Sequence, residues 1–348
     1  MNVGGSSASI RDRGSGRRRR RPLWRCGLAL LGLLAGAALH GGSADAAERT
    51  GPVKIGALTG SWGPTPQVAG LRDGLLALGY RDGEQFVIGV RFTQGDIAAL
   101  PAAARDLVQS GVDVIFATDV NAARAAQMAT NRIPIVFAAV VGDPVALGLV
   151  QSYARPGGNI TGVTDGDIDL GAKRLEIFKE MVPGLKRVLF AYDPNDAYAV
   201  AAARVYRDAA RHLGLVLLEK PVRTEEEART TLSRLRKAEV DGIVAPPALS
   251  LNIPGFVLDA TSQRAIPTMF NGAFFVERGG LASYGPDFYE SGRQAARLVD
   301  KIVKGEDPGR IPVEANPRIE LTINMKVARV LKLTIAPAVS QRANRLIE

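Results

Sequence analysis

The stretch Val112–Ala117, VDVIFA, recurs 128 residues later as VDGIVA at Val240–Ala245. Three further pairs of short segments repeat in the same order, at offsets of 133 to 135 residues. They are 54–58 with 187–192, Leu78-Gly79 with Leu213-Gly214, and Ile133-Pro134 with Ile266-Pro267. Four matches in one order indicate two copies of one architecture, which agrees with the two domains that a chain of about 300 residues usually forms.

Each copy alternates short β-branched runs with helical patterns, such as those over 97–110 and 225–238. This alternation is the signature of a parallel sheet with helices on both faces. We therefore predict an α/β fold of two doubly wound parallel-sheet lobes, joined by a hinge and separated by a cleft. The predicted first lobe comprises 53–162 and 281–305, and the second comprises 163–280 and 306–348.

The segment that joins the two copies, Gly142–Thr164, is rich in glycine and at first sight looks like a phosphate-binding loop. A Walker-type loop needs a Lys-Ser or Lys-Thr pair after its last glycine, because a cation and a hydroxyl must reach the phosphates and Mg²⁺. Here the β-favouring run Ile160–Thr164 follows instead. Gly157 and Gly158 are therefore better explained by a turn in a crossover near the hinge.

The first 46 residues have the features of an export signal. Eight arginines precede or open an apolar run, Cys26–Leu39, and Ala44-Asp45-Ala46 supplies the small residues that a signal peptidase recognises. The run is shorter than the roughly 20 residues of a membrane span. Cys26 lies at the start of this run, whereas a lipidated cysteine belongs at its end. We expect a periplasmic protein cleaved near Ala46, and Arg20-Arg21 leaves both the general secretory and the twin-arginine route open.

Removal of this segment changes the electrostatic argument. The whole chain carries a net charge of +9, but the remainder has 36 basic and 33 acidic residues and a net charge of +3. Most of the positive charge that would attract nucleic acid is lost with the signal, so we expect no nucleic-acid partner. The remainder has no Cys and a single His, His212. This composition excludes thiol nucleophiles, disulfides, multi-His metal sites and His-based triads.

One acidic segment mimics a calcium-binding loop. Asp165, Asp167 and Asp169 have the spacing of calcium ligands, and Glu176 stands at the twelfth position. The sixth position is Leu170, where the sharp turn of such a loop needs glycine. We therefore expect no metal site here, and the sequence indicates no cofactor.

Several motifs resemble those of one family of binding proteins. They are Asp143-Pro144-Val145, Gly148–Val150, Ala154–Asn159, Thr161-Gly162, Lys173–Glu176, Gly280–Gly285 and Leu321–Asn324. Together, over residues 53–348, the chain resembles the ABC-transporter substrate-binding proteins of the tryptophan/tyrosine transport type. The resemblance implies a periplasmic-binding-protein type I fold, in which two lobes joined by three crossovers close on a small ligand and present it to a membrane permease.

Ligands of doubly wound sheets bind outside the carboxyl ends of the strands, so the residues after each predicted strand are the site candidates. Thr59, Gly60, Ser61 and Trp62 follow the first strand. They offer hydroxyls, backbone N–H groups and an indole face to a ligand, although the same residues can form an ordinary turn.

Thr118 and Asp119 follow the strand at 112–117. Asp119 is suited either to pair with a ligand ammonium or to cap the helix that begins near Asn121. Members of the family that the chain resembles commonly carry small neutral residues at this position. Further along, Val140 can face the cleft, and Asp143 either contacts the ligand or caps the next helix.

In the second copy, Tyr192 and Asp193 follow the first strand, and a ligand contact and a capping turn are equally favoured there. Pro246, Asn271 and Phe274 follow later strands. Asn271 can both donate and accept hydrogen bonds, which suits an amide or amino-acid ligand. An Asn-Gly pair is also typical of an ordinary turn.

These features together predict a monomeric, non-enzymatic binding protein. It would capture a small polar ligand, such as an amino acid or a related solute, and deliver it to an ABC permease in the inner membrane. One alternative is a ligand sensor for a membrane receptor. A less favoured one is an exported α/β enzyme, which the lack of GxGxxG, GxSxG and HExxH patterns weakens.

We expect the exported protein to begin near Ala47 and to carry no lipid, because Ala44-Asp45-Ala46 offers the cleavage site and Cys26 lies too early for lipidation. Intact-mass and N-terminal peptide measurements on periplasmic protein check both points. A lipid on Cys26 would contradict the prediction.

Overall fold

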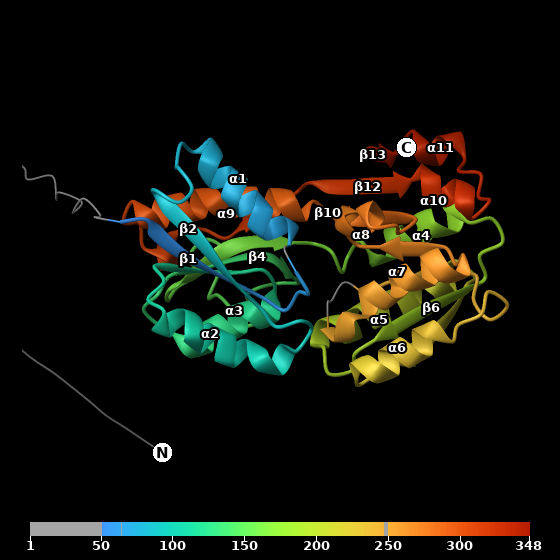
Figure 1. Cartoon of the computed structure of the whole chain (residues 1–348), viewed down its shortest axis with the longest axis horizontal. Coiled ribbons are helices and arrows are strands. Elements are labelled where there is room, and N and C mark those ends of the chain that lie inside the picture. The colour runs from blue at the N-terminus through green and yellow to red at the C-terminus, as the bar shows by residue number, and fades with distance from the viewer. Residues whose placement is uncertain (1–50, 64, 247–249) are drawn as a thin grey trace, which may run out of the picture. The chain divides into compact units, whose positions relative to one another are not determined.

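The computed structural model describes residues 51–63, 65–246 and 250–348, and Figure 1 shows its strands and helices. The first sheet has six strands in the order β11-β5-β4-β3-β1-β2, and the second has seven in the order β13-β12-β10-β9-β8-β6-β7. Neighbouring strands pair in parallel except β10 and β12, which are antiparallel. The predicted fold class of two α/β lobes is confirmed. The predicted signal segment, 1–46, lies outside the described residues.

The first lobe holds the six-stranded sheet between two layers of helices. Its strands are β1 (Val53–Thr59), β2 (Phe86–Phe92), β3 (Val114–Ala117), β4 (Ile135–Val141), β5 (Ile160–Asp165) and β11 (Glu314–Ala315). Apolar side chains of α2 (Leu100–Gln109) and α3 (Val120–Ala129) pack on one face. Those of α1 (Pro66–Ala77) and α9 (Phe288–Val303) pack on the other. Short 3₁₀ turns cover Ile97–Ala99 and Pro308–Arg310.

The second lobe repeats this layering. Its strands are β6 (Arg187–Tyr192), β7 (Val216–Pro221), β8 (Gly242–Val244), β9 (Thr268–Phe270), β10 (Ala282–Pro286), β12 (Ile319–Asn324) and β13 (Arg345–Ile347). One face is covered by α4 (Gly171–Met181), α5 (Ala197–His212), α10 (Met325–Val330) and α11 (Pro337–Ser340). The other is covered by α6 (Glu225–Ser233) and α7 (Ile253–Arg264), which follows a 3₁₀ turn at Ser250–Asn252. The short α8 (Ala273–Glu277) follows β9.

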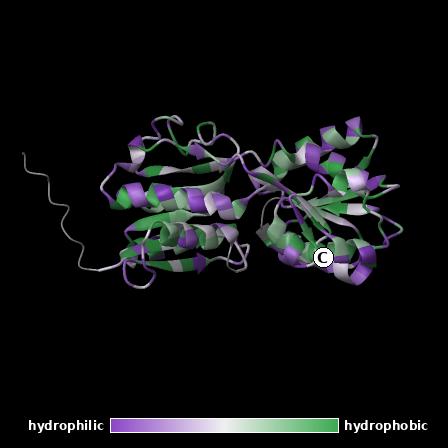
Figure 2. Ribbon diagram, turned by 90° about the horizontal axis from the view of Figure 1, so that it is seen from above, coloured by the Kyte–Doolittle hydropathy of each residue, from purple (hydrophilic) through white to green (hydrophobic). Residues whose placement is uncertain are grey.

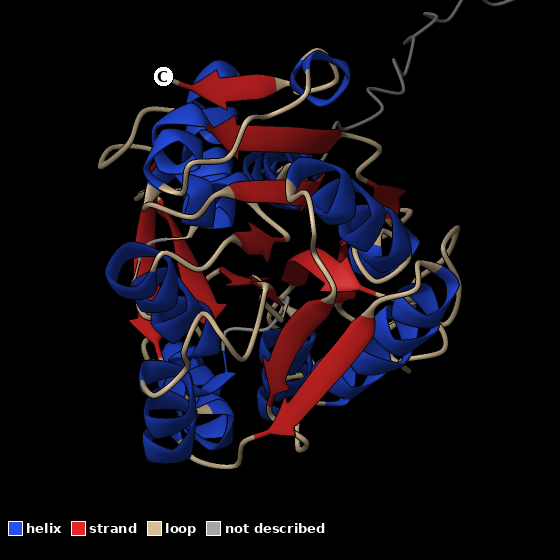
Figure 3. Ribbon diagram, turned by 90° about the vertical axis from the view of Figure 1, so that its right-hand side faces the viewer, coloured by secondary structure: helices blue, strands red, loops and turns tan. Residues whose placement is uncertain are grey.

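Both lobes bury apolar strands beneath amphipathic helices. Figure 3 shows helices on both sides of the strands, and Figure 2 shows green strands next to helices that are banded green and purple. Helices such as α2, α5 and α9 therefore turn an apolar stripe to a sheet and a polar stripe to water. Among the described helices, none combines the length and the apolar character that a membrane crossing requires.

The duplicated Val-Asp pair makes the same hydrogen bond in both lobes. The Asp113 carboxylate accepts the N–H of Lys54 at 2.8 Å, and the Asp241 carboxylate accepts the N–H of Arg187 at 2.7 Å. These bonds tie the start of β3 to β1 and the start of β8 to β6. The repeated sequence VDVIFA and VDGIVA therefore reflects one device for aligning a central strand with its neighbour.

The repeated Leu-Gly pairs end equivalent helices. Leu78 and Leu213 are the C-caps of α1 and α5, and the glycines that follow have φ of +93° and +65°. Glycine adopts this left-handed backbone without the steric cost that other residues incur. The repeat thus marks the point at which each helix stops and turns toward its next strand.

The lobes are joined by crossovers between β5 and α4, between β10 and α9, and between β11 and β12. Sheet membership differs from the predicted lobe boundaries in three segments. The first sheet includes β5 up to Asp165, the second sheet includes 282–286 as β10, and 314–315 returns to the first sheet as β11. The apolar pattern of a strand does not show which sheet it joins, so the predicted boundaries need this correction.

Two glycines bring α1 and α9 into close contact in the first lobe, where α9 is drawn orange beside the blue α1 in Figure 1. A Cβ atom on Gly70 would lie 1.9 Å from the carbonyl oxygen of Tyr289, and one on Gly292 would lie 2.0 Å from that of Gln67. A side chain at either position would therefore force the helices apart. The contact fixes the start of α1 beside the crossover that leads into α9.

The first crossover buries an acidic side chain. Asp165 ends β5, and its Oδ2 atom has no hydrogen-bond partner among the described residues. Burial, and secondarily the charge of Asp167, raises the pKa of Asp165 well above its ordinary value. The folded protein therefore binds a proton at Asp165 more tightly than the unfolded chain does.

We expect this proton to make the stability pH-dependent. Because the pKa of Asp165 is raised on folding, its contribution is fully present below its ordinary pKa near 3.8 and is lost as pH rises toward the raised value. Within that window the loss from one group is at most about 1.4 kcal/mol per pH unit. Asp165→Asn should flatten the fall in melting temperature as pH rises above about 4.

The exposed Asp169→Asn, in the same loop, is the matched control and should leave the pH profile of the melting temperature unchanged. An Asp165→Asn profile that is parallel to the wild-type profile would contradict the assignment.

Candidate functional site

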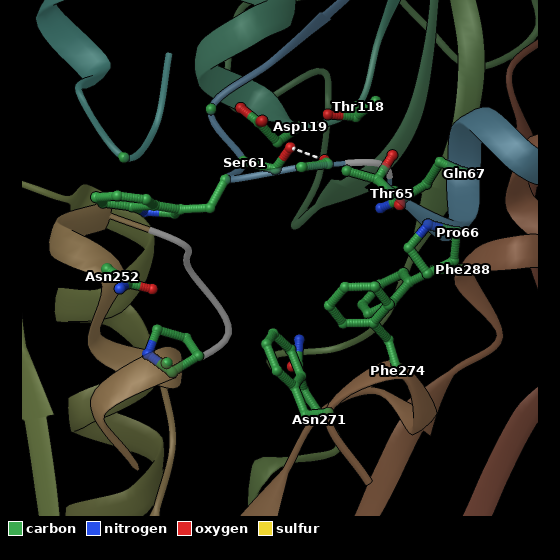
Figure 4. Close-up of a pocket in the computed structure, with 18 of the residues that line it drawn as sticks. Ser61, Thr65, Pro66, Gln67, Thr118, Asp119, Asn252, Asn271, Phe274 and Phe288 are labelled. Atoms are coloured by element: carbon green, nitrogen blue, oxygen red, sulfur yellow. Dashed lines mark hydrogen bonds between the residues drawn. The ribbon is translucent and has the colours of Figure 1, made fainter. Parts of the chain in front are cut away.

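A cavity of about 400 Å³ lies beyond the carboxyl ends of strands from both sheets. Figure 4 shows Ser61, Thr118 and Asp119 on one side of it, and Asn252, Asn271 and Phe274 opposite. The predicted site residues that line this cavity are Gly60, Ser61, Trp62, Thr118, Asp119, Asn271 and Phe274. The predicted residues that do not line it are Thr59, Val140, Asp143, Tyr192, Asp193 and Pro246.

The segment after β1 is shaped by its own hydroxyl groups. Thr59 is fully buried, and its Oγ1 accepts the N–H of Ser61 at 3.1 Å. Ser61 Oγ donates to the carbonyl of Gly63 at 2.6 Å, so the hydroxyl retains only acceptor capacity. Trp62 remains 42% exposed, which leaves much of its ring free to cover a ligand. Thr59 thus supports the cavity wall from behind it.

Asp119 is both a helix cap and a cavity residue. Its Oδ1 accepts the N–H of Ala122 at 2.9 Å at the start of α3, and the side chain is half-buried in the cavity wall. Burial raises the pKa of Asp119, while backbone N–H groups at Ala122, Asn121 and Gly60 counteract the rise by favouring the charged form. The capping role considered from the sequence is thus observed, and the carboxylate also lies in the cavity wall, where a cationic ligand group would offset the cost of burying it.

Two first-lobe candidates lie away from the cavity. Val140 is fully buried in the core, because β4 changes register against β5 between Phe137 and Val140. This irregularity gives Ala139 a φ of +56° and places that residue at the cavity instead. Asp143 accepts the N–H of Val145 at 2.9 Å in a turn and does not cap a helix, since the next helix, α4, begins at Gly171.

The second-lobe candidates that miss the cavity have structural roles. Tyr192 stacks on Phe190 with ring centroids 5.5 Å apart and packs against the core. Asp193 is buried and accepts the N–H of Asn195 at 2.8 Å in a turn. Pro246 is buried after β8. Such roles cannot be separated from ligand contacts by sequence position alone.

The start of α1 contributes cavity residues that the sequence analysis missed. Thr65 caps the helix by accepting the N–H of Val68 at 3.4 Å, and Pro66 occupies its first turn. Gln67 is buried, and its Oε1 has no partner among the described residues. The Thr-Pro pair is a recognisable helix start, and that signal would have placed these residues beside the strand end.

Further missed residues come from the second lobe. Asp196 caps α5 and accepts the N–H of Tyr198 at 2.9 Å, and both residues line the cavity. The guanidinium of Arg278 lies 3.4 Å above the ring centroid of Phe274. Phe288, at the start of α9, adds another aromatic side chain. Only tertiary structure brings this residue to the cavity, because it lies beyond the second crossover.

A buried polar network stands behind Asn271. Asn271 Nδ2 donates to Asp167 Oδ2 at 3.2 Å, and Tyr198 donates to the same oxygen at 2.6 Å. Asp167 also forms an ion pair with Arg174, and both side chains are almost fully buried. The acidic segment that mimics a calcium loop is thus engaged in this pair. Among the described residues, no group of His, Cys, Asp or Glu side chains is arranged to hold a metal ion.

The cavity combines apolar walls with fixed hydrogen-bond acceptors. Aromatic side chains from both lobes supply apolar surface, and Asp119, Asn271 and Gln67 are among the polar residues of the lining. The side-chain oxygens of Asn271 and Gln67 are buried and have no partner among the described residues. Pockets of a few hundred cubic ångströms with a few placed polar groups are typical of small-molecule sites. This arrangement suits a small ligand that carries an apolar part and N–H donors.

Comparisons with known proteins agree with this description. Residues 63–347 match the profile of the family described as ABC transporter substrate binding protein. The chain is 30% identical over 257 residues to a tyrosine-binding protein of Clostridioides difficile, a match that covers 73% of each chain.

Solved structures show the same fold. A conserved domain protein from Vibrio cholerae has a TM-score of 0.74 and 30% identity, over 84% of this chain and 99% of that one. An ABC domain from Streptococcus pneumonia in complex with L-Trp has a TM-score of 0.74 and 27% identity, over 85% of this chain and 100% of that one. The fold is that of the type I periplasmic-binding proteins.

Proposed function

The chain belongs to the ABC transporter substrate binding protein family, and on this premise we propose that it binds an amino acid such as tryptophan or tyrosine in the cavity between its lobes. The observation that carries the proposal is the position of the Asp119 carboxylate in a cavity with aromatic walls. Relatives that bind tyrosine and L-Trp support this ligand class.

The residues that line the cavity offer a contact to both the ammonium group and the aromatic ring of such a ligand. The ammonium group would pair with Asp119 and lower the cost of keeping that carboxylate charged. The aromatic ring would lie against Trp62, Phe274 or Phe288, where ring faces and edges attract one another. Binding would close the two lobes about their crossovers, because only a closed form contacts the ligand from both sides.

The biological setting is also part of the proposal. We infer that the signal over residues 1–46 directs the protein to the periplasm, where it acts as a monomer and hands its ligand to an ABC permease. A ligand-sensing role with a membrane receptor would use the same cavity. Co-purification of the tagged protein with a permease, and not with a receptor, would support the transport role.

Thermal shift and calorimetric titration test the ligand. L-Trp and L-Tyr should raise the melting temperature, since a ligand that binds only the folded protein at 100 times its Kd stabilises it by about 2.7 kcal/mol. Indole-3-propionate, which keeps the ring and carboxylate but lacks the amine, should bind far more weakly. A larger shift with sugars such as myo-inositol than with any amino acid would contradict the proposal.

A pair of substitutions at Asp119 separates its two roles. Asp119→Asn keeps a side-chain acceptor for the N–H of Ala122 but removes the charge. We expect its melting temperature to stay near that of the wild type while affinity for L-Trp falls by about 2 kcal/mol or more, roughly 30-fold. Asp119→Ala should lose the same affinity and, in addition, about 1 kcal/mol of stability from the missing cap.

Calorimetry and melting curves of both variants provide the measurement. Normal L-Trp affinity in Asp119→Asn would assign the carboxylate to capping alone.

A further inference from the structure

We propose that Asp167, held by Arg174, is the positioning residue that sets the orientation of Asn271 and Tyr198 in the cavity. Asp167 does not line the cavity, but it contacts two residues that do. The proposal concerns the same cavity as the proposed function. Its ligand-binding test rests on that function, whereas its hydrogen-exchange test uses the ligand-free protein and does not.

The Asp167 carboxylate accepts hydrogen bonds from three donors. Its Oδ1 accepts from Arg174, and its Oδ2 accepts from the hydroxyl of Tyr198 at 2.6 Å and from Nδ2 of Asn271 at 3.2 Å. The exposed fractions of the Asp167 and Arg174 side chains are 0% and 1%. A carboxylate without water around it can only be stabilised by these partners, so each of them is held firmly in place.

Arg174 is in turn anchored to two other elements of the lobe. Its Nε donates to the carbonyl of Tyr284 in β10 at 2.6 Å, and its Nη1 donates to the hydroxyl of Tyr206 in α5 at 2.7 Å. The planar guanidinium cannot satisfy these acceptors and Asp167 from a different position. Arg174, on α4, therefore fixes the location of Asp167 relative to the strands that reach the cavity.

The charge balance of the cluster favours a single ion pair. Asp165 is also buried nearby, and burial, followed by the charge of Asp167, raises the pKa of Asp165, which shifts its equilibrium toward the neutral form. Burial opposes the charge of Arg174, but Asp167 and the hydroxyl of Tyr206 outweigh it and keep the pKa of the guanidinium raised. Asp167 pairs with Arg174 and also accepts hydrogen bonds from the neutral side chains of Tyr198 and Asn271.

This arrangement determines which polar atoms of the cavity wall can meet a ligand. A carboxylate accepts only donors, so the amide of Asn271 must turn its NH₂ group to Asp167. Its Oδ1 is left as the polar atom without a partner among the described residues. The Tyr198 hydroxyl donates its hydrogen bond to Asp167, so its oxygen can only accept a hydrogen bond from a ligand. Both residues are thus set as acceptors, which selects for N–H donors on the ligand.

A ligand-free measurement tests the contact itself. In protein labelled with ¹⁵N-asparagine, the side-chain NH₂ of Asn271, assigned by its loss in Asn271→Ala, should exchange with water at least 10-fold more slowly than that of the exposed Asn131. The slow exchange should be lost in Asp167→Asn or in Arg174→Lys, the milder variant. Exchange of Asn271 as fast as that of Asn131 in the wild type would overturn the proposal.

A double-mutant cycle tests the consequence for binding, with L-Trp as the probe. Asp167→Asn offers its own NH₂ group to Asn271, and we expect it to weaken binding at least 10-fold. In the Asn271→Ala background the same substitution should cost clearly less affinity, because only the part that acts through Tyr198 is left, while its effect on the melting temperature persists. An equal loss of affinity in both backgrounds would overturn the positioning of Asn271 by Asp167.

Thr268→Val is the matched control. Thr268 is buried in β9 and bonds Thr261 and the N–H of Leu281, away from the cavity, so its loss should lower the melting temperature without changing affinity. If Asp167→Asn does not fold, Arg174→Lys takes its place in the cycle with the same expected pattern. If the wild-type protein does not bind L-Trp, the result counts against the proposed function. The exchange rate of the Asn271 side-chain NH₂ group then decides whether Asp167 positions Asn271.

Discussion

Parallel strand pairing is the constraint on which the rest of this structure depends. Strands that run in one direction end at one edge of their sheet, so the turns after β1 and β3 meet in the first lobe, and the turn after β9 reaches the corresponding edge in the second. The three crossovers bring these edges together around one cavity. The carboxylates of Asp113 and Asp241 hold the central strands in this alignment through bonds to neighbouring backbone N–H groups.

The same constraint explains why helix caps recur in the cavity wall. A strand end that feeds directly into a helix places the N-cap residue at the carboxyl edge of the sheet. Thr65, Asp119 and Asp196 are caps of α1, α3 and α5, and all three line the cavity. Capping and ligand contact are therefore not competing roles in this fold. A cap residue has a fixed side chain and an oxygen atom at the site, which are the properties that recognition needs.

The second lobe contains a buried ion pair, Arg174–Asp167, next to residues that line the cavity. The Arg174–Asp167 pair links α4, α5 and β10 with the turn that carries Asn271. Replacing such a pair by apolar groups is often neutral or stabilising, so stability alone does not account for its presence. We infer that the pair orients its neighbours, because a carboxylate only accepts hydrogen bonds and each amide or hydroxyl around it must therefore point a donor toward it.

The sequence alone determined the duplication, the layered α/β architecture and the strand ends at which a site forms. These features follow from local patterns, since alternating apolar runs and turn residues act over a few positions. Residues such as Ser61, Asp119 and Asn271 were predicted at the cavity because they come directly after strands. The contributions of Phe288 and the Arg174–Asp167 pair were decided by tertiary structure, as was the exclusion of Val140 and Tyr192 from the cavity. Those outcomes depend on how α9 packs against α1, on the register shift in β4 and on which sheet each crossover joins, and contacts between residues far apart in the chain leave no periodic signal in the sequence.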